Sequence, residues 1–282
     1  MDCITIKEVN KIFDNKERKK EYLERLINEA NLLIDIPSTI IGLDRCIVDT
    51  WDYEISKGII RDMFFKSTKY LHGINCKERI DFLINDWYEN DFGELDWPFS
   101  ARNFDGHIAR INRNLNVSEE EKDSIVAFDT IRFRRIKDIN TCRNDYIESL
   151  IVYYNDNVIP TFKHNRGLDF YINGEPFDQK VSRSVGNAFI DAYGERYYRV
   201  AIKEPELVAI SLYENQDEER FGYEPRLLIV YLDDIDMSNE SIEESIMKTD
   251  LSEPVHIEFE YRHSNHEIVR YKTYCYVLIL RK

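Results

Sequence analysis

The chain has 282 residues, of which 43% are hydrophobic and 13% aromatic, so it can bury the core of one large domain or two modest ones. Its formal net charge of −15 argues against broad nucleic-acid binding, because contacts to phosphate need Lys and Arg. The five cysteines lack a CxxC pair and are odd in number, so they indicate neither a disulfide framework nor a zinc site.

The N-terminus and the apolar runs give no sign of a membrane partner. Residues 1–20 are charged and lack the apolar segment of a signal peptide, and no apolar run reaches the length of a membrane span. We therefore expect a cytoplasmic protein. The sequence also lacks P-loop, GxGxxG, HExxH and GxSxG motifs, which argues against ATP hydrolysis, dinucleotide chemistry, zincin proteolysis and serine hydrolase chemistry.

Residues 1–140 are predicted to form a mainly helical N-terminal region. Apolar residues recur at helical spacing in three segments, 15–36, 52–72 and 77–89. Pro37 is expected to end the first of them. Ser118 followed by Glu121 has the form of a capping box, so another helix is expected to begin there.

Residues 141–282 are predicted to carry a mixed central sheet flanked by helices, which places the protein in the α/β (α+β) class. The continuous apolar run 226–232 is typical of a buried central strand. The predicted elements, in chain order, are a helix at 144–155, strands at 158–163, 167–172 and 175–182, a helix at 205–213, and strands at 226–232, 255–262 and 269–280.

The most informative segment is a predicted hairpin centred on Asn173-Gly174. Asn-Gly between apolar runs favours a type I′ turn, in which both central residues need a positive φ. With this turn, Phe170 faces Phe177 and Asp169 faces Asp178. Because strand side chains alternate with a period of two, Asp169, Asp178 and Lys180 share one face.

Two carboxylates directly opposite each other in a hairpin repel, so a sequence that accepts them usually places something between them. The simplest candidate is a divalent cation. Two carboxylates around a hard cation, with a lysine two residues on, form an arrangement that can cleave phosphodiesters. The metal polarises the phosphate and activates a water, and the lysine stabilises developing charge.

This pattern, an Asp on one strand and Asp-x-Lys on its hairpin partner, resembles the active-site signature of the PD-(D/E)XK nuclease superfamily. Asp169 matches the first acidic position, Asp178 the second and Lys180 the lysine. Leu168 stands where the family often has Pro, and the second acid is Asp rather than Glu. The predicted order of helix, three strands, helix and strand fits the restriction-endonuclease-like core.

The resemblance implies a Mg²⁺-dependent endonuclease that hydrolyses DNA, such as a type II restriction enzyme, acting on double-stranded DNA as a homodimer. It also implies a glutamate on the helix before the strands as a further catalytic and metal-binding residue. Glu148 holds that position, and Asp145, one turn earlier, remains an alternative.

Two basic segments are candidates for DNA contacts. Arg183 can bind a phosphate through two hydrogen bonds, with Ser182 and Ser184 as further donors. The second segment holds Arg132, Arg134 and Arg135, interleaved with apolar residues. For both segments, a charged surface that serves only solubility is the alternative.

Three other interpretations stay open. The hairpin can be a surface element with solvated charges. The acidic stretch 233–253, together with the net charge, can belong to a non-enzymatic protein-interaction module. A nuclease of the same fold can also act on RNA or branched DNA.

Overall fold

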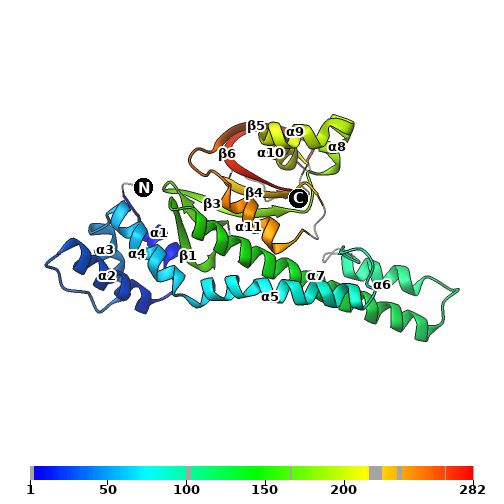
Figure 1. Ribbon diagram of the computed structural model, residues 1–282, viewed down its shortest axis with the longest axis horizontal. Helices are drawn as coiled ribbons and strands as arrows, with labels where there is room; N and C mark the ends of the chain where they lie inside the picture. The colour runs from blue at the N-terminus through cyan, green and yellow to red at the C-terminus, as the bar shows by residue number, and fades with distance from the viewer. Residues whose placement is uncertain are drawn as a thin grey trace. The chain divides into compact units, whose positions relative to one another are not determined.

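The computed structural model describes residues 3–99, 103–165, 167–215, 224–233, 237–263 and 265–281. It shows an α+β protein with a mixed six-stranded sheet flanked by helices (Figure 1). The chain divides into two compact units, one formed by Met1–His72 with Ile147–Lys282 and the other by Gly73–Tyr146. The predicted division at residue 140 and the boundary of the units between Tyr146 and Ile147 both lie inside one uninterrupted helix, α7 (Glu119–Tyr154).

The sheet belongs to the first unit and has the strand order β1-β2-β3-β4-β6-β5. Its strands are β1 (Val158–Asn165), β2 (Leu168–Ile172), β3 (Glu175–Ser182), β4 (Arg226–Tyr231), β5 (Val255–Arg262) and β6 (Ile268–Leu280). The pairs β3–β4 and β4–β6 are parallel, and the other pairs are antiparallel. Every residue of β4 is buried, which confirms the prediction of a buried central strand.

The first unit also contains helices, some of which pack against this sheet. They are α1 (Ile6–Ile12), α2 (Lys16–Ala30), α3 (Ile40–Asp49), α4 (Tyr53–Phe65), α8 (Asn187–Tyr193), α9 (Tyr197–Lys203), α10 (Pro205–Glu214) and α11 (Asn239–Met247). One hydrophobic core joins α8–α10 to β4–β6, with Tyr213 and Phe259 among its buried aromatic side chains. Helices α1 and α4 pack on β1, and α11 packs on β6.

The described residues before position 140 form helices joined by loops, as predicted, but several helix limits differ. Helix α2 ends at Ala30, because Asn31 adopts a left-handed conformation with φ of 50°. The predicted helix 52–72 is two helices, since α4 ends at Phe65 and α5 (Thr68–Glu89) begins after Ser67, whose Oγ accepts from the Tyr70 amide at 3.2 Å. A serine that caps a helix start thus outweighs the continuous apolar pattern.

The second unit contains most of α5, the first part of α7 and α6 (Phe104–Asn112). The predicted capping box at the start of α7 is confirmed. The Glu121 amide donates to Ser118 Oγ at 3.2 Å, and the Ser118 amide donates to Glu121 Oε2 at 2.9 Å. None of the helices in the described parts of the chain combines the length and the apolar character needed to cross a membrane.

Candidate active site

The hairpin that carries the predicted site forms in the predicted register. Asn173 and Gly174 have φ of 52° and 85°, and the Cα partners include Phe170 with Phe177. The turn is anchored at its tip, because Asn173 Nδ2 donates to the Ser252 carbonyl at 2.8 Å and also lies within hydrogen-bonding distance of the Leu251 carbonyl and the Tyr276 hydroxyl. This anchoring fixes which residues of β2 and β3 face each other.

The carboxylate of Asp169 reaches across to β3. Its Oδ2 accepts a hydrogen bond from the Gln179 amide at 2.7 Å, between Asp178 and Lys180 in the sequence. On the other side of β3, Asp178 is in register with Arg226 at the start of β4. The hairpin therefore brings the Asp169 carboxylate beside the segment 178–180 of β3, and a shared site of Asp169, Asp178 and Lys180 stays a prediction.

Asp169 is a partly buried acid with other charged side chains near it. Burial raises the pKa of its carboxyl to about 7, and the negative charges of Glu148 and Asp178 raise it further, against the lowering effects of the Gln179 amide and Lys69. At neutral pH without a cation this group is therefore partly protonated. The residues that repel it are two of the acids predicted to share the site.

Asp178 is in a similar environment, with stronger compensation. Burial raises its pKa, Arg226 and Lys180 lower it, and Glu224 raises it. The positive charge of Lys180, two residues further along β3, thus acts on the Asp178 carboxyl. Arg226 is buried and also lies over the ring of Tyr213, 5.5 Å from its centroid.

Glu148 is the acid of α7 that joins this neighbourhood. Its side chain is 8% exposed and forms an ion pair with Lys69 of α5. Lys69 also donates to the Thr161 carbonyl on β1 at 3.0 Å. Of the two acids left open by the sequence, Glu148 is thus the one whose charge acts on Asp169.

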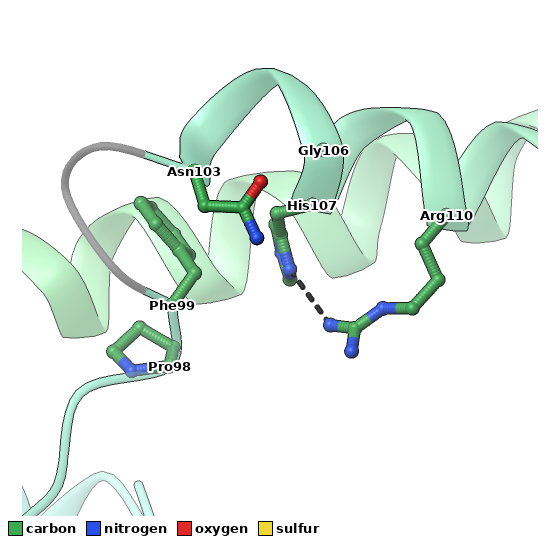
Figure 2. Close-up of a pocket in the computed structure, with 6 residues that line it drawn as sticks. All are labelled: Pro98, Phe99, Asn103, Gly106, His107 and Arg110. Carbon is green, nitrogen blue, oxygen red and sulfur yellow. Dashed lines mark hydrogen bonds between the residues drawn. The ribbon is translucent and has the colours of Figure 1, made fainter. Parts of the chain in front are cut away.

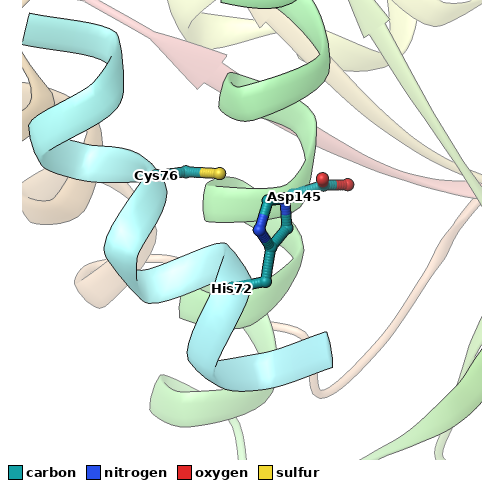
Figure 3. Close-up of side chains that lie close together, drawn as sticks. All are labelled: His72, Cys76 and Asp145. Carbon is teal, nitrogen blue, oxygen red and sulfur yellow. The ribbon is translucent and has the colours of Figure 1, made fainter. Parts of the chain in front are cut away.

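Asp145 belongs to a different group, with His72 and Cys76 (Figure 3). In the described part of the chain, these three form the one group of His, Cys, Asp or Glu side chains whose ligand atoms all lie within 4.8 Å of one another. Burial and the neighbouring Cys142 raise the pKa of Cys76 to about 12. These three ligands are one short of the four that a structural zinc takes, so the group alone does not complete such a site.

The chemistry of Glu148, Asp169 and Asp178 fits Mg²⁺ better. All three offer carboxylate oxygens, the donors that hard cations prefer, and a divalent cation would relieve the repulsion that Glu148 and Asp178 exert on Asp169. Their ligand atoms are not gathered within the 4.8 Å spacing of the first group. The donor set fits a Mg²⁺ ion, and the presence of that ion stays a prediction.

The serines after β3 that were predicted to contact DNA form hydrogen bonds within the turn that follows the strand. Ser182 Oγ donates to the Ser184 carbonyl at 2.7 Å, and Ser184 Oγ accepts from the Gly186 amide at 3.2 Å. Arg183 lies between the two serines and is partly exposed. Both serine hydroxyls thus take part in the turn that follows the strand, and phosphate binding by this segment stays a prediction.

The arginines of α7 lie in the second unit, and two of the three are paired with acids of that unit. Arg135 is 3.1 Å from Asp86, and Arg132 is 3.6 Å from Asp129, while Arg134 is exposed. The segment therefore presents less free positive charge than its sequence implied. DNA binding by these arginines stays a prediction.

The second unit also contains a small pocket of about 190 Å³ beside α6 (Figure 2). It is lined by Pro98, Phe99, Asn103, Gly106, His107 and Arg110. The buried His107 is held from both ring nitrogens, 2.9 Å from Asp129 and 2.9 Å from Arg110. The Phe99 ring stacks with those of Phe133 and His107. The side chains of His107 and Phe99, which are the best suited to bind a ligand in this pocket, thus already contact other residues of the second unit.

Two residues near the acids were missed by the sequence analysis, Lys69 and Arg226. Lys69 is 92 residues from Thr161, which it contacts, and no short motif links the two segments. The sequence does contain an indication for Arg226. It is a charged residue at the start of an otherwise apolar buried strand, and a buried charge needs a partner.

Comparison with known proteins assigns neither a family nor a function to this chain. No protein-family model matches the chain, and neither a curated protein nor a solved structure shows significant similarity to it. Any statement of function therefore rests on the residues of the site.

Proposed function

We propose that this protein is a Mg²⁺-dependent endonuclease that hydrolyses phosphodiester bonds of double-stranded DNA, of the type II restriction class. The observation that carries the proposal is the hairpin, whose Asp169 carboxylate accepts a hydrogen bond from the β3 amide between Asp178 and Lys180, with the charge of Glu148 acting on Asp169. The order of elements from α7 through β1, β2 and β3, then helices, then β4, supports a restriction-endonuclease-like core.

In this mechanism Asp169, Asp178 and Glu148 are the residues that would hold Mg²⁺. The bound ion supplies polarisation of the phosphate and a lowered pKa for an attacking water. Lys180, beside Asp178, stabilises the negative charge that develops on the phosphate. Arg226 favours the ionised form of Asp178, which is the form that can bind a cation.

The test is cleavage of supercoiled plasmid by the purified protein with Mg²⁺ and with EDTA. We expect cleavage only with Mg²⁺, and loss of cleavage in Asp178→Asn, which keeps the size of the side chain but removes its charge. DNA binding in Ca²⁺ should survive this change, because phosphate contacts come from other residues. The matched control is Asp191→Asn, at an exposed aspartate of α8, which should cut normally.

The substrate is settled by parallel reactions with RNA and branched DNA. If the protein cleaves RNA or branched DNA but not duplex DNA, the proposed phosphodiester hydrolysis stands and the proposed substrate is wrong. If wild-type protein cuts none of them, or Asp178→Asn cuts at the wild-type rate, the proposal is wrong. A restriction enzyme that reads a palindrome is expected to be a homodimer, which light scattering of the protein in solution measures.

A further inference from the structure

We infer that Lys69 is a built-in counter-ion of the acidic site, which holds Glu148 in the metal-free protein and competes with a divalent cation for it. This inference rests on the proposed function, because it takes Glu148 as a ligand of the metal. It assigns a role to a residue outside the hairpin and outside the sequence motif.

The ammonium group of Lys69 is surrounded by oxygen atoms of other residues. Its ammonium group contacts Glu148 Oε1 and the Thr161 carbonyl oxygen, the second at 3.0 Å. It also lies 5.9 Å from the centre of the Phe64 ring. Its side chain is 14% exposed and that of Glu148 is 8% exposed, so the pair is largely removed from water.

A buried carboxylate without a counter-ion is costly, so something must compensate Glu148 whenever no metal is bound. Lys69 does this, and its charge also acts on Asp169. A divalent ion held between Glu148 and Asp169 would meet this positive charge at close range. Binding of the ion and pairing of Lys69 with Glu148 therefore oppose each other, and by linkage each weakens the other.

The alternative role for Lys69 is to position Glu148 so that the glutamate is ready to receive the metal. The two roles predict opposite changes in metal affinity when the charge of Lys69 is removed. If Lys69 competes, its loss strengthens metal binding. If Lys69 positions Glu148, its loss weakens metal binding.

The experiment measures Ca²⁺ binding by calorimetry, together with the melting temperature with and without Ca²⁺. The variants are Lys69→Met, which removes the charge, and Lys69→Gln, which keeps a donor for the Thr161 carbonyl and guards against misfolding. We expect both to bind Ca²⁺ about tenfold more tightly than wild type. Their melting temperatures should be lower without Ca²⁺ and should gain more from it.

Two controls fix the interpretation. Lys66→Met removes an exposed lysine of the neighbouring segment and should leave the Ca²⁺ affinity unchanged. Lys69→Met combined with Glu148→Gln removes the ligand for which the lysine competes, so the gain in affinity should disappear. A gain that persists in this double variant would overturn the inference.

The outcomes separate this inference from the proposed function. Tighter Ca²⁺ binding by the Lys69 variants, with no cleavage of any nucleic acid by wild type, would keep the role of Lys69 and end the nuclease proposal. Unchanged or weaker binding, with Mg²⁺-dependent cleavage by wild type, would overturn the inference and leave the nuclease proposal standing. If neither wild type nor the variants bind Ca²⁺, the inference about Lys69 is wrong, and the cleavage assay alone decides the nuclease proposal.

Discussion

The raised pKa of Asp169 predicts how the stability of the metal-free protein depends on pH. The folded protein holds the Asp169 proton up to about pH 7, whereas an ordinary aspartic acid loses it near 3.8. Between pH 3.8 and about pH 7 the folded state therefore binds more protons than the unfolded state. Protonation of Asp169 stabilises the folded state at low pH, and this stabilisation is lost as the pH rises through 7. When the pH is raised from about 5 to about 8, the ionisation of Asp169 should lower the free energy of unfolding by about 3 kcal/mol.

The change that tests this is Asp169→Asn, which removes the titration but can still accept the hydrogen bond from the Gln179 amide. Urea unfolding in EDTA across this pH range gives the free energy for each protein. We expect the variant to be less stable than, or close to, wild type at low pH and to become relatively more stable as the pH rises. The exposed control Asp191→Asn should follow the wild-type curve. Parallel curves for Asp169→Asn and wild type would refute the reasoning.

Three further predictions follow from contacts in the structure. Lys180→Ala should slow plasmid cleavage at saturating Mg²⁺ by about 100-fold or more while DNA binding in Ca²⁺ persists, and a normal rate would make Lys180 a solvated charge only. Asn173→Ala should cost about 2 kcal/mol in urea unfolding, because alanine disfavours the positive φ and loses the anchoring hydrogen bonds, whereas Asn173→Gly should cost less. Arg61→Met should cost about 3 kcal/mol, because Arg61 Nη1 donates to the Asn155 and Val158 carbonyls at 2.6 and 2.9 Å; a loss below about 1 kcal/mol would contradict this.

The sequence predicts the hairpin well because its determinants are local. The Asn-Gly pair sets the turn, and the turn sets the register in which Phe170 pairs with Phe177. The buried strand β4 is equally visible, because its apolar run is continuous and is bounded by Pro225 and Asp233.

The parts that the sequence does not predict depend on contacts between distant segments. Nothing near Lys69 in the sequence indicates that it will pair with Glu148, because the two segments meet only in the folded chain. Likewise, the basic run of α7 reads as a charged surface until Asp86 and Asp129 are seen beside Arg135 and Arg132. Periodicity also fails to separate α4 from α5, since the apolar spacing continues across the serine that caps the second helix.

The scattered origin of the acidic site has a consequence for the order in which the protein folds. The hairpin closes a short loop, so the two aspartates can come together early. Lys69 reaches β1 only across 92 residues of chain, and contacts of such long range form slowly because their loops are entropically costly to close. We therefore expect the hairpin to form before Lys69 pairs with Glu148 in a newly made chain. At that stage the acids of the site would still lack this counter-ion, which arrives only when the unit that holds the sheet has folded completely.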